Sequence, residues 1–163
     1  MDRKARLAAV ATVALLCGCV SVVDQSVETA EIQPTPQQIV AARQSALHLS
    51  GAAMGNMKAV IDAGGDVRTQ VYAARGVMRW ARVLPTLFPD STRAITPTRA
   101  RPEIFDNRAD FEAKAAAYAE AATHLAEAAQ SGDRAAFAAQ FDVTRNACQA
   151  CHERYQVPLN PVR

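Results

Sequence analysis

Two cysteines separated by two residues and followed directly by a histidine, Cys148-Gln149-Ala150-Cys151-His152, lie eleven residues from the C-terminus of this 163-residue chain. Residues three and four apart share one face of a helix, so both thiols and the imidazole can face the same ligand. This spacing is typical of covalent haem attachment, in which the thiols bond to the vinyl groups of a porphyrin and the histidine binds the iron. The motif predicts one covalent haem c, with Cys148 and Cys151 as attachment residues and His152 as the axial iron ligand.

Three other kinds of site share part of this motif. Thiol-disulfide redox enzymes carry C-x-x-C at the start of a helix in a strand-helix-strand unit, but no strand pattern precedes Cys148. A structural zinc site needs a second pair of ligands, and the candidates His48 and His124 are isolated from any such pair. A disulfide between Cys148 and Cys151 would be strained by the narrow loop. Haem attachment is therefore the preferred interpretation.

The composition favours an all-α protein. Half of the residues are hydrophobic, which is enough to build one core, while aromatic residues make up only 6% and alanine is abundant. The β-branched runs that form strands are nearly confined to the N-terminus. The length fits one compact domain with a short extension.

The N-terminus has the pattern of an export signal. Basic residues precede an apolar stretch over residues 7–16 that is too short to span a bilayer. The sequence Leu16-Cys17-Gly18-Cys19 resembles the lipobox of bacterial lipoproteins, which predicts a signal peptide over residues 1–18 and lipidation of Cys19. A plain signal peptide with incidental cysteines and an uncleaved anchor are the alternatives.

Residues 19–34 lack helical periodicity, which predicts a tether between a membrane and the following domain. No aspartate follows Cys19, which predicts anchoring to the outer membrane with the domain facing the periplasm. Without residues 1–18 the basic and acidic residues are equal in number. The mature chain therefore lacks the positive charge that is typical of nucleic-acid binding.

The first two helices of the domain, residues 35–163, have clear start and stop signals. Thr35-Pro36-Gln37-Gln38 has the sequence of a capping box, and the helix that it begins is expected to end at Gly64-Gly65. Asp66 can cap a second helix, which is expected to end before Pro85. Helical periodicity is lost between Leu84 and Asp106, which predicts a long connection with a function of its own.

The last two helices are joined by a short turn. The third is expected to begin at a cap formed by Asp106 or Asn107 and to end at Gly132, and Asp133 caps the fourth. The apolar stripe of the fourth helix continues into the haem motif, so the motif should face the core. Two short turns and one long connection predict an antiparallel up-and-down four-helix bundle, whose interior can hold a cofactor.

With these elements in place, the chain resembles the cytochrome c prime family of monohaem four-helix bundles. Three segments carry the resemblance: Arg43-Gln44-Ser45-Ala46-Leu47 in the first helix, Arg101-Pro102-Glu103-Ile104-Phe105 in the long connection, and Ala147-Cys148-Gln149-Ala150-Cys151-His152-Glu153 in the last helix. The haem motif alone fits many c-type cytochromes. Its position at the end of a helical chain, together with the other two segments, is more specific.

The resemblance implies roles for residues outside the haem motif. Arg43 and Gln44 would lie beside the haem propionates, and Leu47 would cover the distal face of a five-coordinate iron. Family members bind nitric oxide and carbon monoxide, and many form homodimers. The family commonly has a basic residue four positions after the haem histidine, where this chain has Gln156. Such a residue lies beside the axial ligand, so its replacement alters the surroundings of His152.

Three hypotheses for function follow. The first is electron transfer in the cell envelope with an unidentified redox partner, and the second is binding of a small gas such as nitric oxide. A vacant, apolar distal side would favour gas binding, whereas two protein ligands on the iron would favour electron transfer. The third is a helical scaffold lipoprotein without haem. Catalysis has no support, because no acid–base pair or second metal cluster is visible in the sequence.

Replacing Cys19 by serine should release the domain into the soluble fraction or leave an unprocessed precursor, because diacylation supplies the two chains that stable anchoring requires. Membrane fractionation and intact-protein mass spectrometry measure both outcomes. A mature wild-type protein whose mass lacks acyl chains would contradict the lipidation of Cys19.

Overall fold

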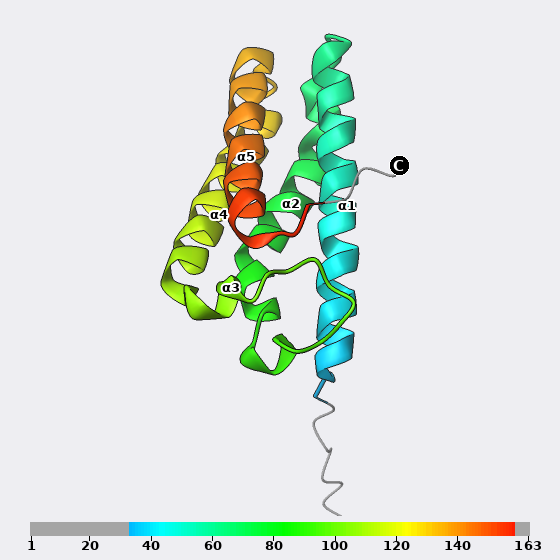
Figure 1. The fold of residues 1–163 in the computed structure, drawn as a ribbon. Helices are drawn as coiled ribbons and strands as arrows, with labels where there is room; N and C mark the ends of the chain where they lie inside the picture. Colours follow the sequence, from blue (N-terminus) through cyan, green and yellow to red (C-terminus); the bar gives the residue numbers. More distant parts are fainter. Residues whose placement is uncertain (1–32, 159–163) are drawn as a thin grey trace, which may run out of the picture. The chain divides into compact units, whose positions relative to one another are not determined.

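The computed structural model describes residues 33–158, so the predictions for residues 1–18, for Cys19 and for most of the tether lie outside the described residues. Four long helices run side by side (Figure 1): α1 (Pro36–Asp62), α2 (Val71–Val83), α4 (Arg108–Ser131) and α5 (Arg134–Tyr155). They alternate in direction along the chain. The predicted all-α, antiparallel four-helix bundle is confirmed.

Local sequence signals set several helix ends as expected. The Thr35 hydroxyl accepts a hydrogen bond from the Gln38 amide at 3.2 Å, and the Gln38 side chain accepts one from the Thr35 amide at 2.8 Å, which completes the capping box. Gly132 ends α4 with a positive φ of 77°, where a side chain would be strained. The Asp133 carboxylate then caps α5 by accepting from the Ala136 amide at 3.0 Å.

The second helix differs from the prediction at its start. Asp66 does accept a hydrogen bond from the Arg68 amide, but it caps a 3-10 helix, η1 (Val67–Gln70), and α2 follows only from Val71. The sequence pattern does not distinguish this tighter turn from an α-helical one, because both bury Val67 in the core.

The long connection also contains more structure than its lack of periodicity indicates. It includes η2 (Leu84–Leu87), η3 (Asp90–Thr92) and the short α3 (Glu103–Asp106). Proline favours the first positions of such turns, since its fixed φ suits them and its missing amide is not needed there. These pieces are each too short to produce a periodic apolar pattern.

Helix α4 forms the centre of the core and packs against both α2 and α5. Small alanine side chains let the helices approach closely, and larger side chains fill the space between them: Met57, Val77, Leu125, Phe137 and Phe141. Thr144 is the buried polar residue of α5, and its hydroxyl hydrogen-bonds to the carbonyls of Ala121 and Gln140. This contact fixes α5 against α4 one turn before the haem motif.

The connection between α2 and α4 is fastened to α1 by two neighbouring side chains. Arg43 is only 2% exposed, and its guanidinium donates to the Leu87 carbonyl at 3.1 Å and to the Thr92 and Thr98 hydroxyls at 3.0 and 3.3 Å. Gln44 donates to the Pro97 carbonyl at 3.0 Å. Burial lowers the pKa of Arg43, yet an arginine stays protonated in proteins, so the loop acceptors must satisfy its charge.

In residues 33–158 no helix is long and apolar enough to cross a membrane.

Replacing Phe137 by alanine should lower the free energy of unfolding by about 3 to 5 kcal/mol, because its fully buried ring leaves a cavity between α4 and α5. Val143 on the same helix is half exposed, so Val143→Ala should change it by about 0.5 kcal/mol or less. Urea denaturation followed by circular dichroism compares the two variants, and equal effects would contradict the burial described.

Candidate functional site

The C-terminal half of α5 forms one wall of a large cavity. Cys148, Cys151, His152 and Tyr155 all line this cavity, whose volume is about 950 Å³. The helix is held in place here by Tyr155, whose hydroxyl donates to the Asp110 carboxylate at 2.5 Å and whose ring packs edge-on against Phe111. The structure therefore places the two thiols and the imidazole of the sequence motif in one cavity wall, and their roles toward a haem stay predictions.

Helix α1 forms the facing wall. Its side chains that line the cavity recur at three- and four-residue spacings: Gln44, Leu47, His48, Ser50, Gly51, Met54, Gly55 and Lys58. A Cβ atom added at Gly51 or Gly55 would meet nothing within 4 Å, so α1 leaves open space beside these two residues. Such a gap between two helices of a bundle suits a flat ligand that lies between them.

Burial governs the protonation of the three key side chains. It raises the pKa of the Cys148 thiol to about 11, with a further contribution from Cys151, and it also raises the pKa of Cys151. Although His152 is exposed to the cavity, partial desolvation and the positive charge of Arg99 lower the pKa of its imidazole. A neutral imidazole is the form that binds a metal ion.

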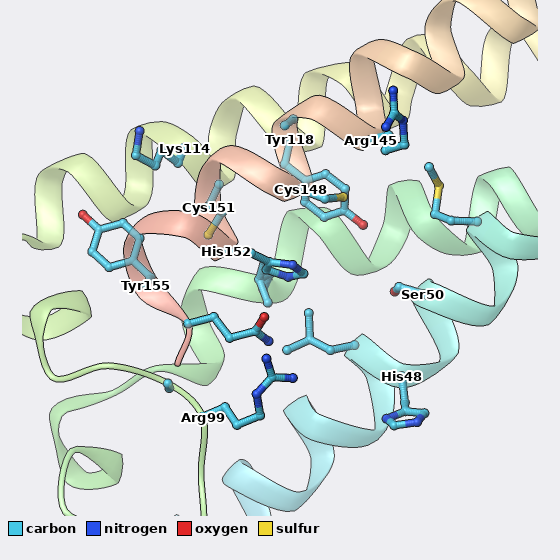
Figure 2. Close-up of a pocket in the computed structure, with 18 of the residues that line it drawn as sticks. His48, Ser50, Arg99, Lys114, Tyr118, Arg145, Cys148, Cys151, His152 and Tyr155 are labelled. Carbon is cyan, nitrogen blue, oxygen red and sulfur yellow. The ribbon is translucent and has the colours of Figure 1, made fainter. Parts of the chain in front are cut away.

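The other predicted residues separate into two groups. Gln44 and Leu47 line the cavity, whereas Arg43 does not, because its guanidinium is turned into the loop that it holds. The propionate contacts that the resemblance implies for Arg43 and Gln44 stay predictions. His48 is exposed at the cavity rim, and Figure 2 shows its ring pointing away from His152.

One charged residue of the cavity wall was not predicted from the sequence. Arg99 lies in the long connection, where no helical pattern indicates the direction of a side chain, yet it lines the cavity near His152 (Figure 2). The chain positions it by pairing residues 99–101 with the end of α5: the Arg101 amide donates to the Tyr155 carbonyl at 2.9 Å, and the Val157 amide donates to the Arg99 carbonyl at 2.8 Å.

The cavity fits a haem in both shape and chemistry. The paired thiols can serve as two covalent attachment points, and the neighbouring imidazole can serve as an iron ligand. Apolar side chains such as Leu47, Phe88 and Ile104 cover most of the remaining wall. Its volume falls within the range of about 300 to 1,000 Å³ that is usual for cofactor sites.

Comparison with known proteins agrees with this geometry. The family model described as cytochrome C′ matches residues 38–156. The chain belongs to the cytochrome c′ family. One relative, the cytochrome c′ of Pararhodospirillum photometricum, is 30% identical over 125 residues, which cover 75% of this chain and 98% of that protein.

Solved cytochromes c′ share the fold. One with an unusual ligand-controlled dimer dissociation has a TM-score of 0.73 at 28% identity and covers 77% of this chain and 99% of its own. A ferrous variant from Alcaligenes xylosoxidans with bound NO has a TM-score of 0.70 at 27% identity, with coverages of 78% and 99%. Cytochromes c′ carry covalently bound haem c, so the cofactor prediction is confirmed and the non-haem scaffold has no support.

Proposed function

We propose that this cytochrome c′ faces the periplasm and binds small diatomic gases such as nitric oxide. In this proposal Cys148 and Cys151 form the thioether bonds, and His152 is the axial ligand of a single haem. The position of all three side chains in one cavity wall supports these roles. The haem supplies an iron whose sixth coordination position can bind NO or CO.

The proposal rests mainly on the position of Leu47, a residue of α1 in the cavity wall that faces α5. Leu47 lines the cavity and has no atom that can ligate a metal ion. Its apolar surface excludes water from the space in front of His152, which favours a five-coordinate, high-spin resting state. A diatomic gas can enter when Leu47 shifts, whereas a larger ligand would require further movement of packed side chains.

Electron transfer is the second candidate function. Met54, two turns after Leu47, also lines the cavity and carries a thioether that can serve as an iron ligand. Ligation by Met54 would give a low-spin, six-coordinate protein suited to electron transfer. Both functions use the cofactor for binding or redox exchange rather than for catalysis on a substrate.

The remaining proposals concern the setting of the protein. Lipidation at Cys19 would anchor it to the outer membrane. A homodimer would use exposed apolar side chains on α1 and α2, of which Leu49 is 71% and Tyr72 is 88% exposed. Its redox partner is unidentified.

The double variant Cys148→Ala/Cys151→Ala should abolish covalent haem attachment, because both thioether bonds are lost. Denaturing electrophoresis with a haem stain measures this, and each single variant should keep a weaker band through its remaining thiol. Cys17 lies in the predicted signal peptide, so Cys17→Ala is the cysteine control and should leave the mature domain stained. A stained band in the double variant would contradict the assignment.

Replacing Leu47 by alanine should speed carbon monoxide binding by at least tenfold and admit water, because the shielding side chain is removed. A loss of stability of about 2 to 5 kcal/mol is expected if the site cannot collapse. Stopped-flow absorption and the spin state of the ferric spectrum are the measurements. Val143→Ala, at a half-exposed position of α5 that does not line the cavity, is the control. A low-spin wild-type spectrum in both oxidation states would favour electron transfer instead.

A further inference from the structure

Four basic side chains line the cavity, and three of them are neutralised within the protein. Each of these three pairs with an acidic residue on its own helix: Lys58 with Asp62 at 2.6 Å, Lys114 with Asp110 at 3.8 Å, and Arg145 with Asp142 at 3.3 Å. Arg99 is the fourth, and it forms no ion pair with any residue in the range 33–158. The cavity wall therefore carries one uncompensated positive charge, at Arg99.

The Arg99 side chain is held in place but keeps its binding groups available. Its Nε donates to the Val157 carbonyl at 2.8 Å, and its backbone carbonyl accepts from the Val157 amide, so both ends of the residue are tied to the segment after α5. Neither terminal nitrogen of the guanidinium donates to another group in the described part of the chain. Two parallel N–H groups on a fixed guanidinium are suited to bidentate binding of a carboxylate.

The position of Arg99 relative to the haem motif indicates which carboxylate this side chain would bind. In Figure 2 the two cysteines lie on one side of His152, and Arg99 lies on the opposite side. Lys114 and Arg145 lie on the cysteine side. A haem carries its vinyl groups on one edge and its two propionates on the opposite edge. If the vinyl edge is bonded to Cys148 and Cys151, as proposed, the propionates would lie on the side of His152 where Arg99 is found.

Arg43, which the resemblance places at the propionates, is differently engaged. Its terminal nitrogens donate to three acceptors of the long connection, its guanidinium lies 4.3 Å from the centre of the Phe88 ring, and it does not line the cavity. Because the guanidinium of Arg43 is buried and does not line the cavity, a propionate could reach it only if the loop moved, whereas Arg99 already lines the cavity.

We propose that Arg99, rather than Arg43, binds a haem propionate in this protein. Gln44 binds the Pro97 carbonyl and Arg43 binds the Thr98 hydroxyl, so both residues hold the loop segment that directly precedes Arg99. In this proposal Arg43 acts indirectly, through the position of Arg99. This inference rests on the proposed haem attachment at Cys148 and Cys151.

The test compares haem-loaded wild type with Arg99→Gln, Arg99→Lys and the control Arg93→Gln. Arg93 lies in the same loop, pairs with Asp106 and does not line the cavity, so its variant removes one equal charge elsewhere. Resonance Raman spectra report the propionate bending mode, and spectroelectrochemistry reports the midpoint potential at pH 7. Arg99→Gln should shift the bending mode and lower the potential, because loss of a nearby positive charge favours ferric iron. Arg99→Lys should retain the wild-type potential in larger part, and Arg93→Gln should leave the bending mode unchanged.

The other outcomes overturn the inference. An unchanged bending mode in Arg99→Gln means that Arg99 does not contact a propionate, even if the potential moves. Absence of covalent haem from the wild type would be seen in the haem stain before any variant is measured, and it would overturn the proposed function as well. If Arg99→Gln does not mature, a crystal structure of the haem-loaded wild type decides: a propionate bound to Arg99 supports the inference, and one bound to Arg43 alone overturns it.

Discussion

The buried guanidinium of Arg43 is the interaction on which the functional end of this bundle depends. A charged group removed from water is strongly destabilising unless its donors are satisfied, and no carboxylate in residues 33–158 forms an ion pair with it. The acceptors come instead from three points along the connection between α2 and α4. A segment that lacks a periodic apolar face is thereby drawn onto α1. The loop then closes one side of the cavity and carries Arg99 to its wall.

Packing within the bundle is uneven, and this unevenness creates the site. Helix α4 buries an alanine-rich face against both α2 and α5, and Thr144 fixes the register of α5 through the Ala121 carbonyl. Helix α1 contributes few fully buried residues, namely Val40, Arg43 and Met57. Its middle section, with Gly51 and Gly55, faces the cavity instead of filling it. Three helices therefore provide most of the core, and the fourth covers a space of the size of a cofactor.

Local signals in the sequence were sufficient to predict most of the fold. The capping residues Thr35, Gln38 and Asp133 act within one turn of the chain, so their effect does not depend on tertiary contacts. The haem motif was also readable, since the helical spacing of Cys148 and His152 fixes their common face. Arg43 and Arg99 could not be placed in this way. The partners of Arg43 lie 44 to 55 residues away in a loop that has no periodic pattern, and the partner of Arg99, Val157, lies 58 residues away after α5.

The pairing of residues 99–101 with 155–157 restrains the C-terminal end of α5 against fraying. Helix termini near the end of a chain usually fray, because their last carbonyls and the following amides have no fixed partners. Here the carbonyl of Tyr155 and the amide of Val157 are both bonded to the loop. The last turn, which carries His152, is thus followed by a segment that is hydrogen-bonded to residues 99 and 101 of the loop. Fluctuations of the imidazole should accordingly follow those of the whole loop and helix unit, and its orientation toward the cavity should be as steady as that of a side chain in the middle of a helix.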